Sequence, residues 1–287
     1  MKGSFPDHVP PRVHLTEIPF YAQSALQCGP AALAMVLQSS GVDIRPDDLA
    51  PQVYTPDRKG SLQPELISAA RRHRRLAYPI QGLQCLLAAV AAGRPVVVLQ
   101  NLGLSWLPRW HYAVVVGYDL AQSQVILHTG IHADRTVGLA TFDHTWQRAD
   151  RWGLLVMPAG EMPVCAEEPL YLQAALGLQQ AGYAQEAARA FEAAVGQWPA
   201  STPALMAWGN ALYASGNPRA AADAFQRATY IDPDNGAAFN NLAHVLAEQG
   251  SLAAAEAAAR RAVQLDGPQM ALYQQTLEEI QNRKDRR

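Results

Sequence analysis

Hydrophobic positions follow two different patterns along the 287 residues of the chain. In the first part, short apolar runs of strand length alternate with polar turns, as in segments 96–100, 111–119 and 124–129. In the second part, small and aromatic residues recur with a fixed long period. β-branched runs bounded by turn residues are typical of strands, whereas long fixed periods are typical of repeat proteins. We therefore expect two domains of different class.

The first part is expected to begin with helices and to end in a sheet. A strand-like segment at 13–19 precedes three segments with helical patterns, which are 31–37, 62–75 and 82–92. Strands are expected at 96–100, 111–119, 124–129, 136–142 and 153–158. The turn at 120–123 predicts that the strands on either side of it pair as a hairpin. Helices followed by an antiparallel sheet give an α+β domain.

The second part repeats itself every 34 residues, and Gly182, Gly216 and Gly250 show the step most clearly. This pattern resembles the tetratricopeptide repeat, whose unit is a pair of antiparallel helices. Each glycine is expected in the turn between two helices, where a left-handed backbone is needed. We expect an all-α solenoid of three repeats at 169–201, 202–235 and 236–269, followed by a capping helix near 270–283.

Stacked repeats of this kind present a concave groove lined by the first helix of each unit. The resemblance implies that a protein partner binds there, and that Asn210, Tyr213, Asn240 and His244 line the groove. The asparagines could hold the backbone of a bound peptide through their side-chain amides. The alternative is that Asn210 and Asn240 are solvated polar residues on a helix face.

Composition and charge exclude several classes of function. Lys and Arg number 23 against 25 for Asp and Glu, so the net charge of −2 gives no basis for a nucleic-acid binder. No apolar run approaches the ~20 residues that cross a bilayer, so no membrane span is expected. Cys28, Cys85 and Cys165 are too few and too scattered for a disulfide framework or a metal site. Cys85 is expected in the core and Cys165 without a role, and no metal or cofactor is expected.

Cys28 is the strongest candidate for chemistry. It lies where the helix around 31–37 begins, because Pro30 suits the first turn of a helix. The positive end of the helix dipole is expected to lower the pKa of the thiol, and Gly29 to keep the approach to the sulfur open. His111, at the start of a strand, could take the thiol proton, and Gln23 could donate to an oxyanion. A buried structural role for Cys28 is the alternative.

These residues together resemble the bacteriocin-processing (double-glycine leader) peptidase family, a branch of the papain-like cysteine peptidases. The resemblance rests on Gln23 and on segments 27–33, 95–99 and 111–119, and it spans about residues 17–158. It implies a papain-like domain in which Cys28 is the nucleophile, His111 the base and Gln23 the oxyanion donor, acting on a peptide or protein substrate. We place this domain at 14–160, a linker at 161–168 and the repeats at 169–283.

Bacterial proteins that join such a domain to tetratricopeptide repeats resemble this chain along its whole length. They are commonly exported or lipid-anchored, so the resemblance implies a periplasmic or lipid-anchored protein, with a cytoplasmic location as the alternative. Trp106 and Trp110 precede His111 and are expected either to form a wall of the substrate cleft or to pack within their loop.

The sequence departs from the family at the third catalytic position, which is an Asp or Asn in the family. The pairing of the strands puts Thr129 there, with His128 before it, so one of these two is the expected third member. Asp134 and Asp143 are further carboxylates that could substitute. The leading prediction is a cysteine peptidase whose repeats recruit substrate or partner. A catalytically degenerate peptide- or leader-binding module and a thiol-dependent acyltransferase are the alternatives.

Overall fold

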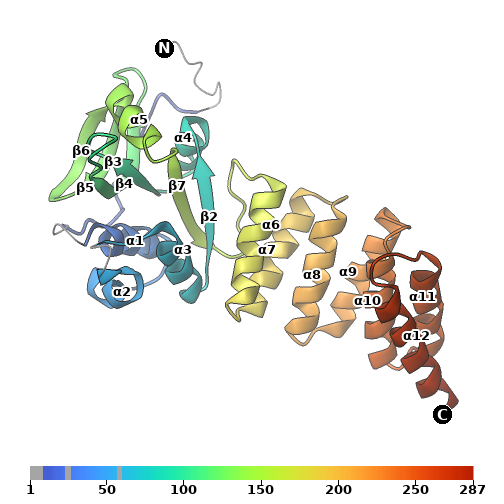
Figure 1. Ribbon diagram of the computed structural model, residues 1–287. Coiled ribbons are helices and arrows are strands. Elements are labelled where there is room, and N and C mark those ends of the chain that lie inside the picture. The colour runs from blue at the N-terminus through green and yellow to red at the C-terminus, as the bar shows by residue number, and fades with distance from the viewer. Residues whose placement is uncertain (1–8, 23–26, 57–59, 287) are drawn as a thin grey trace. The chain divides into compact units, whose positions relative to one another are not determined.

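The computed structural model describes residues 9–22, 27–56 and 60–286. The chain divides into two compact units, Met1–Ala174 and Ala175–Arg287 (Figure 1). Clusters of buried apolar side chains occur within each unit. The α+β domain followed by a run of helices agrees with the predicted fold class, whereas the domain limits at 14–160, 161–168 and 169–283 remain predictions.

The first unit is built on an antiparallel sheet. Its strands, among the described residues, are β1 (Arg12–His14), β2 (Arg75–Gln81), β3 (Val96–Asn101), β4 (Trp110–Asp119), β5 (Gln124–Thr129), β6 (His132–Gly138) and β7 (Trp152–Pro158). The order across the sheet is β2-β7-β3-β4-β5-β6, and β1 pairs with the far end of β4. The hairpin predicted for 111–119 and 124–129 is confirmed by the pairing of β4 with β5.

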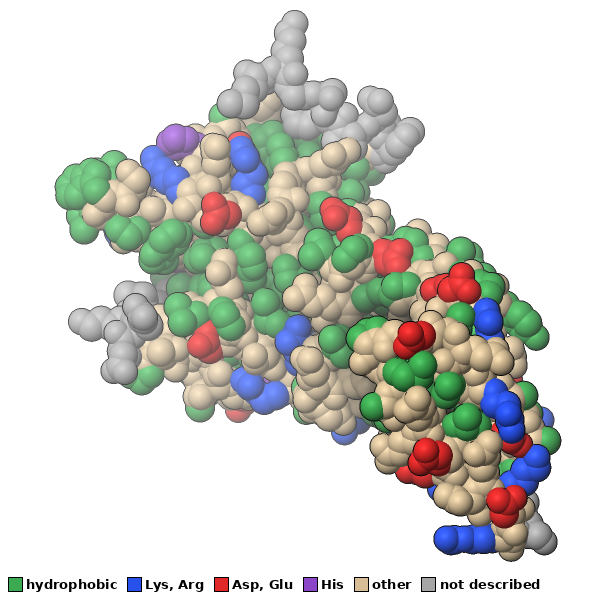
Figure 2. All heavy atoms as spheres, turned by 45° about the vertical axis from the view of Figure 1, so that its right-hand side comes forward, with side chains coloured by type: hydrophobic (Ala, Val, Ile, Leu, Met, Phe, Trp, Pro, Cys, Tyr) green, Lys and Arg blue, Asp and Glu red, His purple; other side chains and the backbone are tan. Residues whose placement is uncertain are grey.

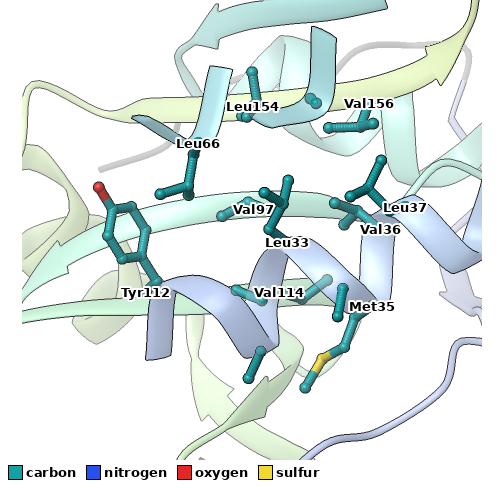
Figure 3. Close-up of a cluster of buried hydrophobic side chains, with 14 of the residues drawn as sticks. Leu33, Met35, Val36, Leu37, Leu66, Val97, Tyr112, Val114, Leu154 and Val156 are labelled. Carbon is teal, nitrogen blue, oxygen red and sulfur yellow. The ribbon is translucent and has the colours of Figure 1, made fainter. Parts of the chain in front are cut away.

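The described residues of this unit also form α1 (Cys28–Ser39), α2 (Pro46–Val53), α3 (Gln63–Arg72), α4 (Leu83–Ala91) and α5 (Leu139–Gln147). Helices α1, α3, α4 and α5 pack on the sheet, and α2 packs on α1 and α3. In Figure 1, α1, α2 and α3 lie on one side of the sheet and α4 and α5 on the other. Helix α1 is buried on nearly every side between its neighbours and the sheet, which explains why its sequence is apolar all round. Figure 3 shows Leu33, Val36 and Leu37 of α1 beside side chains of β3, β4 and β7. This packing fixes the position of the first residue of α1, which is Cys28.

Three predicted elements were wrong in their limits. The strand expected at 13–19 is confined to β1, Arg12–His14. The helix expected at 62–75 ends at Arg72, and β2 follows in its place. Arg74 has a positive φ of 57°, which breaks the helix before the strand. The strand expected at 136–142 ends at Gly138, where α5 begins, because Phe142 and Trp146 are buried at helical spacing.

A disulfide bond corrects the prediction for the cysteines. Cys85 of α4 is bonded to Cys165, 80 residues further along the chain, and Cys28 is a free cysteine. Cys85 is partly exposed rather than buried in the core, so its sulfur can reach the segment after β7. Spacing in the sequence gave no sign of this pair, because the fold rather than local chain geometry brings the two residues together.

The repeats consist of α6 (Glu168–Gln180), α7 (Ala184–Gln197), α8 (Thr202–Ala214), α9 (Pro218–Ile231), α10 (Gly236–Glu248), α11 (Leu252–Gln264) and α12 (Met270–Asp285). Gly182, Gly216 and Gly250 have φ values of +88°, +81° and +78°, which confirms their predicted role in the turns. Positive and negative side chains are interspersed over the face that Figure 2 shows, and neither sign dominates it.

Candidate active site

Cys28 is the first residue of α1 and follows the N-cap residue Gln27. Its side chain is partly buried and its thiol is free. Pro30 lies in the first turn, where its missing N–H costs no intrahelical hydrogen bond, and the amide of Ala31 closes that turn on the carbonyl of Gln27 at 3.1 Å. The local sequence therefore places the sulfur at the helix N-terminus, as predicted.

The environment of the thiol differs from the predicted one. Burial raises the pKa of Cys28, and hydrogen bonds from the backbone of Tyr112, Gly29 and Cys28 itself offset the rise only in part. The backbone at the helix N-terminus lowers this pKa, as predicted, but desolvation of the thiolate outweighs that effect and the net shift is upward. The hydrogen bond from Tyr112 also shows that the sulfur lies beside β4, next to the backbone of the residue that follows His111.

His111 is the second residue of β4 and pairs with Gln100 of β3. Its Nε2 atom lies 2.7 Å from Oγ1 of Thr129, at the end of β5. Burial lowers the pKa of His111, and the positive charges of Arg109 and Arg135 lower it further. The imidazole is therefore neutral at neutral pH, with one nitrogen held by the threonine hydroxyl.

Thr129 and His128 were the two candidates for the third catalytic position. Thr129 is hydrogen-bonded to His111, whereas His128 is hydrogen-bonded elsewhere. The backbone N–H of Asp134 donates to Nδ1 of His128 at 3.2 Å, and Nε2 of His128 lies 3.2 Å from the carbonyl of Ile18. Because Nδ1 accepts a hydrogen bond, the ring proton is on Nε2 and is donated to Ile18. His128 thus holds the segment after β1.

The two carboxylates that could have replaced the missing acid are engaged elsewhere. Asp134 accepts a hydrogen bond from His14 at 2.8 Å, and Asp143 forms a two-point ion pair with Arg151 at 2.7 and 2.9 Å. The Arg151 guanidinium holds the pKa of Asp143 below its ordinary value. Neither is hydrogen-bonded to His111. The predicted oxyanion donor Gln23 lies outside the described residues.

Three polar side chains that the sequence analysis missed lie near Cys28. A Cβ added to Gly29 would meet the hydroxyl of Ser61 at 2.3 Å, so glycine allows this close approach. The Ser61 hydroxyl and one Glu65 oxygen are buried with no hydrogen-bond partner among the described residues. Burial raises the pKa of Tyr112, and the charges of Cys28 and Glu65 raise it further, which places both of these groups within electrostatic reach of Tyr112. No motif in the sequence marks Ser61 or Glu65.

The predicted groove residues of the repeats divide into two sets. Tyr213 of α8 donates a hydrogen bond to Glu248 of α10 at 2.8 Å and lies 3.2 Å from the ring of His244, so these side chains join consecutive repeats. The exposed Asn210 accepts a hydrogen bond from Asn241 at 3.2 Å. Asn240 was wrongly placed on the accessible face, because it is only 6 % exposed and points to the packed side of α10.

Trp106 and Trp110 are 77 % and 55 % exposed. They therefore do not pack within their loop, which was one of the two expectations for them. They lie in and after the connection between β3 and β4, directly before His111.

Comparison with known families agrees with this architecture. Residues 15–153 match the Peptidase_C39 like family, and residues 172–235 and 206–269 match the tetratricopeptide repeat. The chain therefore has a C39-like peptidase domain followed by tetratricopeptide repeats. This confirms the resemblance found in the sequence, and the helices and antiparallel sheet described above are those of the C39-like domain.

Solved structures match the two parts separately. A chain from Bacillus anthracis, provisionally described as a C39-like peptidase, is 20 % identical with a TM-score of 0.44, and the match covers 51 % of this chain and 97 % of that one. The type III secretion translocator chaperone SycD of Yersinia enterocolitica is 21 % identical with a TM-score of 0.38, covering 40 % of this chain and 83 % of that one. The Sgt2 repeat domain of Aspergillus fumigatus is 18 % identical with a TM-score of 0.39, covering 41 % and 79 %. A search of curated proteins finds no match.

Within residues 9–22, 27–56 and 60–286, no group of three or more His, Cys, Asp or Glu side chains could hold a metal ion. No helix in the same ranges is long and apolar enough to cross a membrane.

Proposed function

We propose that the C39-like domain is a cysteine peptidase in which Cys28 is the nucleophile and His111 the base. The observation that carries the proposal is the junction between α1 and β4. The sulfur of Cys28 receives a hydrogen bond from the backbone of Tyr112, the residue after His111, while the far nitrogen of His111 is held by Thr129. A free thiol and an oriented imidazole on adjoining elements are the parts that thiol-dependent acyl transfer requires.

The reaction follows from the protonation state of the ring. For Nδ1 of His111 to accept a proton, the ring proton must be on Nε2, where it is donated to Thr129 Oγ1 at 2.7 Å. The Cys28 sulfur attacks the peptide carbonyl while its proton passes to Nδ1, and that proton then leaves on the amine product. Water attacks the thioester, its proton passing to His111, and the bond between carbon and sulfur breaks. His111 returns that proton to the sulfur, which regenerates the thiol and releases the acid product.

The resting pair is uncharged in this scheme. Burial raises the pKa of Cys28, and burial with two nearby arginines lowers that of His111, so both shifts favour the neutral thiol and the neutral imidazole. Proton transfer then accompanies attack on the substrate instead of preceding it. Gln23 remains the proposed oxyanion donor.

We also propose that the repeats recruit the substrate or a protein partner. Tetratricopeptide repeats support protein–protein interaction, and the polar side chains of Asn210, Tyr213 and His244 on α8 and α10 would contact a bound peptide. The identity of that peptide is not part of the proposal.

The disulfide supports a location outside reducing compartments. Bonds such as Cys85–Cys165 persist in oxidising environments, whereas cytosolic thiols are kept reduced. We therefore favour the exported, periplasmic or lipid-anchored, alternative for this chain.

A peptide-binding module without catalysis is the second candidate, and one observation favours it. The partner of His111 is a hydroxyl, which stabilises an imidazolium far less than a carboxylate does, and the thiol pKa is raised rather than lowered. In that case the same site binds a peptide and releases it uncut.

The test is cleavage of a mixed peptide library by wild type, Cys28→Ala and His111→Ala, read by mass spectrometry. His132→Ala is the matched control, because His132 is an exposed histidine of β6. We expect wild type and His132→Ala to give the same new termini, and the two site variants to give none. Equal cleavage by Cys28→Ala would end the peptidase proposal, and uncut peptides retained by all variants would support the binding module. Amide products in the presence of an added amine would indicate acyl transfer.

A further inference from the structure

The connection between β3 and β4 exposes an unusual concentration of large apolar side chains. We call residues 102–110 the 102–110 hairpin, and its exposed members are Leu102 (51 %), Leu104 (51 %), Trp106 (77 %), Leu107 (60 %) and Trp110 (55 %). Ile131 is 71 % exposed and lies at the same end of the sheet. Thr129, two residues before it, contacts His111, and His111 directly follows Trp110. Exposed apolar clusters on soluble domains mark surfaces that bind something.

This hairpin is rigid rather than loose. The amide of Leu102 donates to the carbonyl of Arg109 at 2.9 Å, and Leu104 and Leu107 exchange two backbone hydrogen bonds of 3.1 Å. The buried side chain of Asn101 accepts from the amides of Gly103 and Arg109, both at 2.9 Å. From α5, Arg148 donates to the carbonyl of Gly103. The fold thus keeps these apolar side chains exposed to water, which is unfavourable. Because the hairpin is already ordered, it loses less conformational entropy when it binds.

The charge around the hairpin is positive. No Asp or Glu occurs from Asn101 to Tyr118, nor from His128 to Ala133, whereas Arg109 is in the hairpin and Arg148 is bound to it. Asp143, on the same helix as His144, is neutralised by Arg151. The hairpin and the segment 128–133, which carry no acid, together with Arg109 and Arg148 complement anionic lipid headgroups.

The shape of the surface favours a bilayer over a peptide. A groove that binds a peptide half-buries the residues that line it, but each of these side chains is more than half exposed. Tryptophan is also the residue enriched where membrane meets water, because its ring is apolar and its N–H remains hydrated. We propose that the 102–110 hairpin inserts into the interfacial region of an anionic phospholipid bilayer and docks the C39-like domain on a membrane surface. This holds whether or not the domain cleaves peptides.

The first experiment is co-sedimentation of the full chain with phosphatidylglycerol-containing vesicles and with pure phosphatidylcholine vesicles. Wild type should sediment with the former, and Trp106→Ser combined with Leu107→Ser should lower its partition at least about tenfold, because two exposed apolar anchors are lost. Tyr230→Ser, which removes a 74 % exposed aromatic residue from the repeats, should bind as wild type does. Arg109→Gln should weaken binding to the anionic vesicles only.

The second experiment reports insertion directly, through quenching of tryptophan fluorescence by brominated lipids. Trp106→Phe with Trp110→Phe should keep most of the vesicle binding while losing most of the quenching. Absence of vesicle binding by wild type, or equal binding by the Trp106→Ser and Leu107→Ser variant, would overturn the proposal. So would capture of apolar peptides by the hairpin without any lipid binding, which would assign the surface to a peptide.

Discussion

Thr129 gives His111 a neutral partner in place of a charged one. A hydroxyl 2.7 Å from Nε2 orients the ring as a carboxylate would, but it adds no negative charge to offset burial and the nearby arginines. Burial and the charges of Arg109 and Arg135 therefore lower the pKa of His111, and the Thr129 hydroxyl supplies no charge to oppose them.

Replacement of Thr129 should move the titration of His111 in a known direction. In Thr129→Asp, a carboxylate beside Nε2 stabilises the imidazolium, so the pKa of His111 should rise by about 1–3 units. Thr129→Val removes the hydrogen bond and should lower peptide cleavage, where it occurs, by about 10–100-fold. The measurement is NMR titration of the His111 ring, with His132→Ala used to assign the exposed histidine. An unchanged His111 titration in Thr129→Asp would contradict the assigned contact.

The thiol should resist alkylation until the solution is more alkaline than an ordinary cysteine requires. The raised pKa of Cys28 means that the reactive thiolate forms only above the usual ~8.5, so the rate of iodoacetamide labelling should keep rising beyond that pH. Mass spectrometry of the labelled Cys28 peptide gives the rate, and free cysteine serves as the reference. A plateau of labelling at neutral pH would show a thiolate–imidazolium pair instead and would contradict the neutral resting state.

Local sequence identified Cys28 and His111 because a helix start and a strand start are marked within a few residues of each. It could not choose between Thr129 and His128. The β4–β5 and β5–β6 ladders each contain a register shift near this position, between Val115 and Gly117 and between Leu127 and Thr129. Such an irregularity changes which side chains share a face, and strict alternation in the sequence does not reveal it.

At the scale of elements, Gly209 shows how close the packing of the repeat helices is. A Cβ at Gly209 of α8 would lie 2.5 Å from the ring of Phe225 of α9, so this pair sets the approach of the two helices. Gly196 of α7 has no neighbouring atom within 4 Å of the same position. A side chain at position 209 would therefore clash, whereas one at position 196 has room.

Substitution of each glycine by alanine should change stability in opposite directions. Gly209→Ala should lower the free energy of unfolding of the repeats by about 1–3 kcal/mol, because the phenyl ring must move. Gly196→Ala should raise it by up to about 1 kcal/mol, since alanine favours the helix and meets no neighbour. Urea unfolding followed by circular dichroism measures both changes. A loss of stability in Gly196→Ala as large as in Gly209→Ala would show that the effect is not steric.

The repeats were the easiest elements to predict and β2 the hardest, for one physical reason. Every repeat helix packs mainly on neighbours within a few tens of residues. The residues that make these contacts therefore recur every 34 positions and can be recognised in the sequence. Strand β2 pairs only with β7, with Arg75 opposite Pro158, and its own residues include Pro79. Proline is tolerated there because β2 is an edge strand, a circumstance that depends on a partner far along the chain.

At the scale of the whole molecule, the bond between Cys85 and Cys165 closes the longest covalent loop that the described residues contain. The loop takes in β3 to β7, which include His111 and Thr129. A cross-link of this span acts mainly by restricting the unfolded chain.

Removal of the disulfide should therefore cost substantial stability. Cys85→Ser with Cys165→Ser should lower the free energy of unfolding of the C39-like domain by about 4 kcal/mol, as loop-closure entropy for an 80-residue separation suggests. Chemical denaturation with and without reductant measures the loss. The reductant should destabilise wild type and Cys28→Ser but leave the double variant unchanged. Equal midpoints for wild type and the double variant would contradict a disulfide in the folded protein.

The pairing of β1 with β4 has a consequence for the order of synthesis. Arg12 of β1 pairs with Asp119 of β4, so β1 leaves the ribosome long before its partner and remains unpaired until β4 has been made. Three residues cannot persist as a strand alone, and contacts so distant along the chain form slowly. The backbone of Tyr112, which meets the sulfur of Cys28, is also made late. A nascent chain therefore carries Cys28 for a long interval before β4 can shield it, and in that interval Cys28 can pair oxidatively with Cys85, which is made before β4.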